Sequence, residues 1–300
     1  RCSLLFLCLK TCIKKSLFIL NPNLSSLPMQ LIIKKFFIII FFIITSSSWQ
    51  SKIFASNKNF FDDYGLISIM YHRFNESKYP STNIQLNVFK DQLKIIEKEG
   101  IKFIHPKEFE FSISQQKNDR KILLTVDDGL LSFYENAWPI LKKEKIPFIL
   151  FVSTREVGSF NYMNWDQIRE ISQSELAEIG NHSHSHEYLV DESSEEIRKD
   201  LQKSIKIFED KLGKNSEFFS YPFGEYSLEF KKLIKELGFK YAFGQHSGVI
   251  DETKDVLELP RFPINEKYGE IERFKTLIKT LPFKYKNIFP EERYLLQSNN

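Results

Sequence analysis

Cysteine is nearly absent from this sequence, and its three residues, Cys2, Cys8 and Cys12, all lie within the first 28 positions. The rest of the chain therefore has neither a disulfide nor a thiolate ligand for a metal. Any metal in that part must be bound by histidine and carboxylate side chains. The lack of cysteine also suits an exported protein that folds without oxidation.

Acidic residues are missing from the first 55 positions, which carry seven basic ones: Arg1, Lys10, Lys14, Lys15, Lys34, Lys35 and Lys52. Subtracting these seven charges from the net charge of +3 leaves −4 for the remainder. A mildly acidic chain without a basic stripe argues against a nucleic-acid partner.

The stretch that begins at Met29 has the order of residue types found in a secretory signal peptide. Lys34 and Lys35 precede an uninterrupted apolar run at residues 36–44, and a polar stretch then leads to Ala55. This layout predicts a signal peptide with cleavage after Ala55. The apolar run is short for a transmembrane span, although an uncleaved membrane anchor is the alternative.

The chain has no internal repeat, no long linker and no second apolar core. We expect three parts: residues 1–28 as translated upstream sequence, with Met29 as the true start, residues 29–55 as the signal peptide, and residues 60–290 as a single domain.

Apolar runs of strand length alternate with amphipathic runs of helix length along that domain. Strands are expected at 66–71, 101–104, 121–126, 148–152, 176–179, 218–221, 239–243 and 257–262, and helices at 87–99, 131–143, 164–172, 193–212, 227–238 and 270–279. Asn164, Ser193 and Ser227 predict helix starts, and Pro139 predicts a kink or a late start. The alternation predicts an α/β fold with a parallel sheet, either open or closed into a barrel.

Polar groups follow four of the expected strands, beginning with His72 and the neighbouring pair Asp127 and Asp128. In a closed α/β barrel such strand ends converge on one face. Two adjacent carboxylates repel each other, so a metal, an arginine or protonation of one of them must offset the charge.

Three histidines follow a later strand. His182 and His186 are four residues apart, a spacing that can bring both imidazoles to one ion, while His184 offers rival pairings. One aspartate and two histidines are a common ligand set for a catalytic divalent metal. Zn²⁺ suits these ligands, and Co²⁺, Ni²⁺ and Fe²⁺ are alternatives.

Three motifs resemble those of the polysaccharide deacetylase family, also called carbohydrate esterase family 4 or the NodB homology domain. Thr-Val-Asp-Asp-Gly at 125–129 is similar to its Thr-Phe-Asp-Asp-Gly signature, residues 180–186 to its His-Ser/Thr-x-x-His motif, and residues 220–224 to its third motif. The resemblance covers roughly residues 64–265. It implies a distorted (β/α)7 barrel that removes N-acetyl groups from amino sugars.

The resemblance also implies a role for each matching residue. Asp127 would be the general base, and Asp128 would bind the metal with His182 and His186. The backbone N–H of Phe223 would help the metal to hold the tetrahedral oxyanion.

The chain departs from the common family pattern in two places: the third motif has no arginine, and no late Leu-x-His motif supplies a general acid. Both departures resemble the branch that contains the poly-N-acetylglucosamine deacetylases of biofilm export, where an early Tyr-His supplies the acid. That resemblance implies His72 as general acid, with His246 as its rival. Arg261 would pair with Asp127 in place of the missing arginine.

Tyr221 and Trp165 are expected to contact or support the substrate, although Trp165 is equally consistent with a core position. The expected activity is metal-dependent N-deacetylation of an amino-sugar polymer, most simply a poly-N-acetylglucosamine of the envelope or matrix, by a periplasmic or secreted protein. Peptidoglycan, chitin oligomers and lipid-linked sugars are alternative substrates. A non-catalytic carbohydrate-binding protein with a residual metal site is the alternative from another class.

Overall fold

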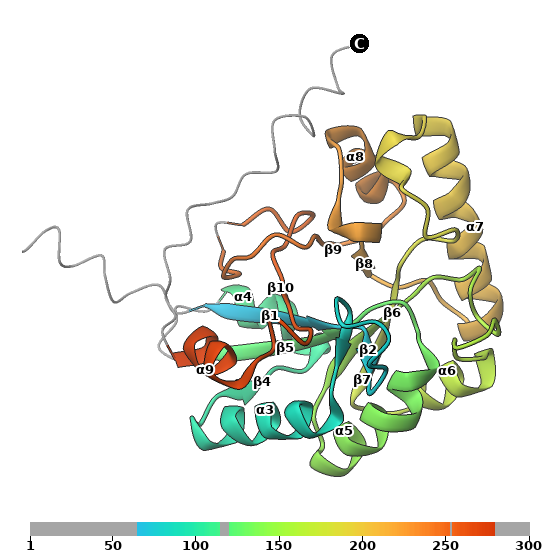
Figure 1. Cartoon of the computed structure of the whole chain (residues 1–300). Coiled ribbons are helices and arrows are strands. Elements are labelled where there is room, and N and C mark those ends of the chain that lie inside the picture. Colours follow the sequence, from blue (N-terminus) through green and yellow to red (C-terminus); the bar gives the residue numbers. More distant parts are fainter. Residues whose placement is uncertain (1–64, 115–119, 253, 280–300) are drawn as a thin grey trace, which may run out of the picture. The chain divides into compact units, whose positions relative to one another are not determined.

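The structure is a computed structural model that describes residues 65–114, 120–252 and 254–279. The expected upstream sequence and signal peptide lie outside these residues. Within them, one sheet has the strand order β10-β1-β5-β6-β7-β8-β9, and β4 also pairs with β5 (Figure 1). All its neighbouring strands are parallel: β1 (Leu66–Tyr71), β4 (Lys102–Phe103), β5 (Lys121–Val126), β6 (Phe148–Val152), β7 (Ala177–Asn181), β8 (Phe218–Ser220), β9 (Tyr241–Phe243) and β10 (Phe262–Pro263).

Helices surround this curved sheet, as Figure 1 shows. They are α3 (Leu86–Lys98), α4 (Phe109–Ser114), α5 (Trp138–Glu144), α6 (Trp165–Ser172), α7 (Ser194–Leu212), α8 (Leu228–Glu236) and α9 (Ile271–Lys279). Shorter turns of helix cover Pro106–Glu108, Phe133–Ala137, Leu189–Asp191 and Pro222–Gly224. The predicted α/β barrel architecture in a single domain is confirmed. None of the helices in the described ranges is long and apolar enough to span a membrane.

The predicted helix starts are also confirmed. The Asn164 side chain accepts a hydrogen bond from the N–H of Gln167, and the Gln167 side chain accepts one from the N–H of Asn164. Ser193 and Ser227 cap α7 and α8 in the same side-chain-to-backbone manner. The helix that contains Pro139 starts late, because a π-helical turn at Phe133–Ala137 precedes α5.

The last expected strand, at residues 257–262, is wrong in its extent. Leu259 forms only a single bridge with Phe243 of β9, while β10 begins at Phe262 and pairs with Ile69 of β1. Pro260 lies between these two contacts and has no N–H to donate to a ladder. The segment therefore contacts β9 at Leu259 and β1 from Phe262 onward. It connects the two edges of the sheet through an interrupted set of strand contacts.

Other differences are smaller. β7 runs from Ala177 to Asn181 instead of 176–179, and β9 begins at Tyr241 instead of 239. Two elements were not expected: α4, and the small parallel sheet of β2 (Arg73–Phe74) and β3 (Asn83–Ile84).

Alternating side chains of the strands build two cores. In β5, Leu123 belongs to a cluster that joins β1, β6, β8 and β9 across the inside of the curve, while Ile122 and Leu124 pack on the helix side. Phe109 of α4 lies 5.9 Å from Phe218 and 4.8 Å from Tyr241 between ring centroids. Because these two residues begin β8 and β9, α4 fills the amino-terminal end of the interior. The carboxyl end is left for polar groups.

Candidate metal centre and active site

The carboxyl ends of β1 and β5 place His72 and the two aspartates side by side. Tyr71 pairs with Val126 in the parallel register, and the N–H of Asp127 donates to the Tyr71 carbonyl at 2.9 Å. The chain then turns sharply, with φ of 76° at Asp128 and 72° at Gly129. A left-handed conformation is unfavourable for aspartate and is common at functional sites.

Asp128, His182 and His186 form a three-residue group whose ligand atoms all lie within 4.8 Å of one another. Oδ1 of Asp128 is 3.5 Å from Nε2 of His182 and 3.3 Å from Nε2 of His186. Two ligands of a tetrahedral ion with bonds of about 2.1 Å are separated by roughly 3.4 Å, so these spacings fit a shared metal better than a direct hydrogen bond.

Two further observations fit a metal at this group. Nδ1 of His182 donates to the Ser220 carbonyl at 2.6 Å, which leaves the Nε2 lone pair facing Asp128. Oδ1 of Asp128 is buried and accepts no hydrogen bond from any described residue. A buried carboxylate oxygen in this position needs a cation. A divalent metal fits the donor set, and His and Asp do not distinguish Zn²⁺ from Co²⁺, Ni²⁺ or Fe²⁺.

The loop after β7 gives the three histidines different partners. Positive φ angles at Ser183 (68°) and His186 (54°) fold it back, and the His186 N–H donates to Oγ of Ser183 at 3.0 Å. The ring of His184 is hydrogen-bonded instead to Oγ1 of Thr154 at 2.8 Å. The structure therefore brings His182 and His186 to Asp128 and directs His184 elsewhere.

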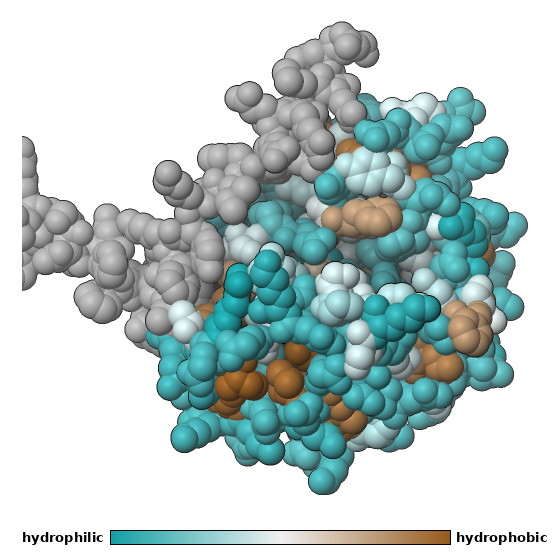
Figure 2. All heavy atoms as spheres, viewed as in Figure 1, coloured by the Kyte–Doolittle hydropathy of each residue, from teal (hydrophilic) through white to brown (hydrophobic). Residues whose placement is uncertain are grey.

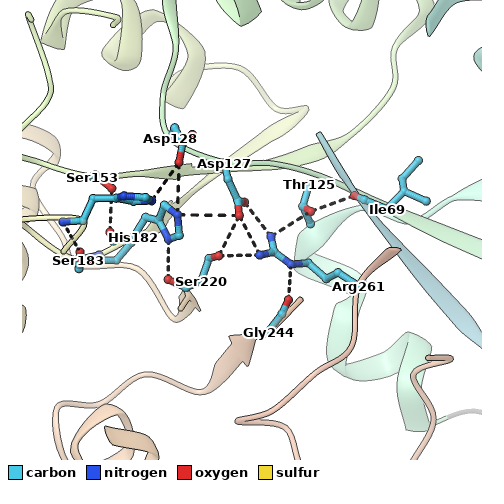
Figure 3. Close-up of polar contacts among 12 residues, drawn as sticks. Ile69, Thr125, Asp127, Asp128, Ser153, His182, Ser183, Ser220, Gly244 and Arg261 are labelled. Atoms are coloured by element: carbon cyan, nitrogen blue, oxygen red, sulfur yellow. Dashed lines mark hydrogen bonds and ion pairs between the residues drawn. The ribbon is translucent and has the colours of Figure 1, made fainter. Parts of the chain in front are cut away.

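Asp127 pairs with a guanidinium, and its Oδ2 also lies 3.9 Å from Nε2 of His182 (Figure 3). Nη1 of Arg261 donates to Oδ1 of Asp127 at 2.7 Å, and Nη2 donates to Oδ2 at 2.8 Å. The other guanidinium hydrogens reach Oγ of Ser220 at 2.8 Å, Oγ1 of Thr125 at 3.4 Å and the Gly244 carbonyl at 2.9 Å. Both charged side chains are almost wholly buried. The ion pair expected between Arg261 and Asp127 is thus present.

Opposing effects set the charge of the two carboxylates. Burial raises the pKa of Asp127, but Arg261 and His182 outweigh it and hold the pKa below its ordinary value. Burial also acts against ionisation of Asp128, and its two histidine neighbours hold the pKa of that carboxyl well below the ordinary range. Both groups are therefore anionic at neutral pH.

The two candidate acids have different surroundings. Burial lowers the pKa of His72, while Asp128 and Asp127 act in the opposite direction. His72 follows Tyr71, which pairs with Val126, so it lies at the strand end beside the aspartates. Burial lowers the pKa of His246 to about 4, and the charges that reach it are Lys254 and Arg261. Of these two histidines, His72 is the one whose pKa responds to both aspartates.

Phe223 lies on the rim of this site. Its φ is 60°, its side chain is 51% exposed, and its ring centroid lies 5.0 Å from that of His186 and 5.8 Å from that of Tyr188. Within the described part of the chain, its N–H donates to no backbone carbonyl. The half-exposed ring therefore lies beside His186 at the edge of the site.

Tyr221 and Trp165 are placed in packing positions. Tyr221 is buried, stacks on Tyr226 at 4.8 Å and donates its hydroxyl to the Leu257 carbonyl at 2.9 Å. Trp165 begins α6 and packs its ring edge against Phe208 of α7. Trp165 is partly buried and packs against the core, and the buried Tyr221 precedes the turn that carries Phe223.

Two further residues at the site have no signal of their own in the sequence. Ser220 occupies the place where the third motif usually has arginine, yet its hydroxyl joins the Asp127 pair. Tyr162 forms a bridge with Leu130, two residues after Asp128, and burial and the Asp128 carboxylate raise the pKa of its phenol. Only the positions of the loops in the folded structure identify Ser220 and Tyr162 as residues of the site.

Comparison with known proteins agrees with the geometry. The family model for polysaccharide deacetylase matches residues 114–242. A poly-β-1,6-N-acetyl-D-glucosamine N-deacetylase of Staphylococcus aureus (strain MSSA476) is 28% identical over 228 residues, which cover 71% of this chain and 77% of that protein.

Solved structures have the same fold. IcaB from Ammonifex degensii superposes with a TM-score of 0.65 at 26% identity, over 72% of this chain and 97% of that one. The Streptococcus pyogenes deacetylase PplD, solved with acetate, has a TM-score of 0.65 at 23% identity, over 72% and 98% of the two chains. The chain therefore carries a polysaccharide deacetylase domain and is a hydrolase of the class expected from its sequence.

Proposed function

We propose that this protein is an exported, metal-dependent N-deacetylase of a polymer of N-acetylglucosamine, most simply a poly-β-1,6-linked one. The observation that carries the proposal is the division between the neighbouring carboxylates. Asp128 faces two histidines at metal-ligand spacing, while Asp127 forms its ion pair with Arg261 and is not part of that group. A hydrolase with one metal needs both a ligand and a free base at the same point.

The metal would be held by Asp128, His182 and His186, with Zn²⁺ as the ion that this set favours. When bound, it supplies a Lewis acid and lowers the pKa of water. Asp127 takes the proton of the attacking water, since its carboxylate is ionised and fixed in direction. The N–H of Phe223 donates to the carbonyl oxygen as negative charge develops there.

The leaving amine needs a proton, and His72 is the proposed donor. Its place at the end of β1, beside the aspartates at the end of β5, supports this role, whereas burial, Lys254 and Arg261 lower the pKa of His246. A general acid must lie within hydrogen-bonding reach of the leaving atom. Tyr221 and Trp165 support this arrangement through packing.

The proposed substrate class and location of the protein rest on features other than the metal group. The relative from Staphylococcus aureus is named for poly-β-1,6-N-acetyl-D-glucosamine. The face drawn in Figure 2 is mostly hydrophilic, with apolar residues in small separate groups, which suits a hydrated polymer. The charged, apolar and polar order of residues 29–55 supports export.

Acetate release from defined oligomers tests the proposal. The wild-type protein should release acetate from β-1,6-linked N-acetylglucosamine oligomers faster than from chitin oligomers or peptidoglycan fragments. Asp127→Asn should abolish release. Equal release by the wild type and Asp127→Asn would contradict the mechanism, and a preference for another polymer would change the substrate. Sugar binding without any acetate release would indicate the non-catalytic alternative.

A further inference from the structure

Arg261 is a buried cation whose five guanidinium hydrogens all have acceptors. Two go to the carboxylate of Asp127, and the remaining three go to Ser220, Thr125 and the Gly244 carbonyl. Its guanidinium carbon also lies 5.5 Å from the ring centroid of Phe151. A guanidinium with all its hydrogens bonded has one favourable orientation. The acceptors around Arg261 are therefore held in fixed positions relative to one another.

Ser220 has two functions within this network. Its hydroxyl accepts from Nη2 of Arg261 and donates to Oδ2 of Asp127 at 3.1 Å. Its carbonyl accepts from Nδ1 of His182 at 2.6 Å. The register explains the second contact, because Asn181 pairs with Phe219 and the next residue of each strand is then adjacent. Figure 3 shows Ser220 between His182 on one side and the Asp127–Arg261 pair on the other.

We propose that Ser220 is a positioning residue that fixes the Asp127 carboxylate relative to the metal ligand His182. This inference rests on the proposed deacetylase function. The bidentate pair with Arg261 alone leaves the carboxylate free to rock about the guanidinium axis. The Ser220 hydroxyl adds a third contact to Oδ2, from the strand that also orients His182.

The small size of Ser220 is part of the same arrangement. The residue is fully buried at the end of β8, and Arg261 reaches Asp127 from the segment that closes the sheet. A side chain as large as arginine at position 220 would occupy the space that the Arg261 guanidinium fills. Serine is small enough to admit it and polar enough to satisfy one of its hydrogens.

Ser220→Ala tests the proposal, and Ser68→Ala is its matched control. Ser68 is also a fully buried serine at a strand position, but its hydroxyl has no hydrogen-bond partner among the described residues. Both variants should retain wild-type metal content, measured by elemental analysis. Ser220→Ala should lower kcat for acetate release by about 10- to 100-fold with KM nearly unchanged, because the base is misaligned while the groove is intact. Ser68→Ala should match the wild type in both constants.

Ser220→Thr keeps the hydroxyl and should recover most of the lost kcat. The proposal is contradicted if Ser220→Ala has the kcat of the wild type. It is also contradicted if the Ala and Thr variants lose kcat to the same extent and both lose metal or folded protein in proportion. Failure of the wild type itself to release acetate would overturn the proposed function and this inference together. A fully active Ser220→Ala would overturn the inference alone.

Discussion

The charge at the centre of the site is balanced residue by residue. Asp127 and Asp128 are neighbours, yet one is paired with a cation from far along the chain and the other faces two imidazoles. Removing one partner of a buried pair leaves an uncompensated charge, which is more costly than losing the pair as a whole.

Arg261→Met should therefore destabilise the fold by about 3–5 kcal/mol at pH 7, as measured by denaturant unfolding of the chelated protein. Arg198→Met is the matched control, since Arg198 pairs with Glu236 on the exposed faces of α7 and α8. It should leave the unfolding midpoint nearly unchanged. Equal midpoints for both variants would contradict a structural role for the Arg261 pair.

The same variant has an expected pH dependence. The pKa of Asp127 in the folded protein lies below its ordinary value of 3.8, so its stabilisation is complete above that value and is lost as the pH falls through the folded pKa. Without Arg261, burial would instead raise the pKa, and the folded variant would take up the proton first. The stability gap between wild type and Arg261→Met should therefore narrow from pH 7 to pH 4. A constant gap would show that the charge of Asp127 is not its cause.

The choice of general acid is also a question about single residues. His72→Gln should lower kcat by about 100- to 1,000-fold, because general acid catalysis is lost. His246→Gln should stay within a few-fold of the wild type, because burial, Lys254 and Arg261 lower the pKa of His246 and neither aspartate acts on it. Steady-state acetate release by both variants decides between them, and the reverse order would assign the acid to His246.

At the scale of elements, the turn after β8 shows how backbone shape carries the site. Phe223 and Gly224 both have positive φ, at 60° and 72°. A Cβ on Gly224 would lie 2.1 Å from Cβ of Gln245 and 2.6 Å from its backbone nitrogen. This turn must therefore pass directly against the chain that follows β9.

Gly224→Ala and Gly238→Ala separate the effect of that contact from backbone strain. Gly238 has φ of 88° but nothing within 4 Å of an added Cβ. Its substitution should cost about 1–2 kcal/mol in unfolding free energy with unchanged kcat, because only the left-handed backbone is penalised. Gly224→Ala adds a clash of about 1–3 kcal/mol and should also lower kcat, since it displaces the Phe223 N–H. Equal effects of the two changes on kcat would contradict a role for the turn.

The elements differ in how far the sequence could predict them. Asn164, Ser193 and Ser227 act through hydrogen bonds within one turn of chain, so their helix starts were predictable. The metal group was also predictable, because its motifs lie at the ends of strands. The last strand is interrupted at Pro260 because its two parts contact different edges of the sheet, β9 and β1. A local sequence pattern cannot predict such a contact.

The directions of side chains were harder to predict from the sequence than the positions of the residues along the strands and helices. Tyr221 follows the site residue Ser220 in sequence, but its ring packs on Tyr226. The partly buried ring of Trp165 packs on Phe208 of α7. The contact between Ser220 and Arg261 spans 41 residues and depends on the register of several strands. Such buried polar contacts follow from the complete fold and not from the spacing of residues.

At the scale of the whole molecule, the site exists because the sheet curls. Residues from position 72 to position 261 converge at the carboxyl ends of the strands, while Phe109 fills the opposite end of the interior. The metal ligands come from two separate loops, after β5 and after β7. The central claim is that these loops together hold one catalytic divalent ion.

Acetate release after removal and return of the metal tests that claim most directly. Wild-type protein treated with a chelator should lose acetate release from β-1,6-linked N-acetylglucosamine oligomers and regain it when Zn²⁺ or Co²⁺ is added back. Asp128→Ala should bind less metal and should not regain activity under the same addition. Full activity of the thoroughly chelated wild type, or of Asp128→Ala, would contradict the account.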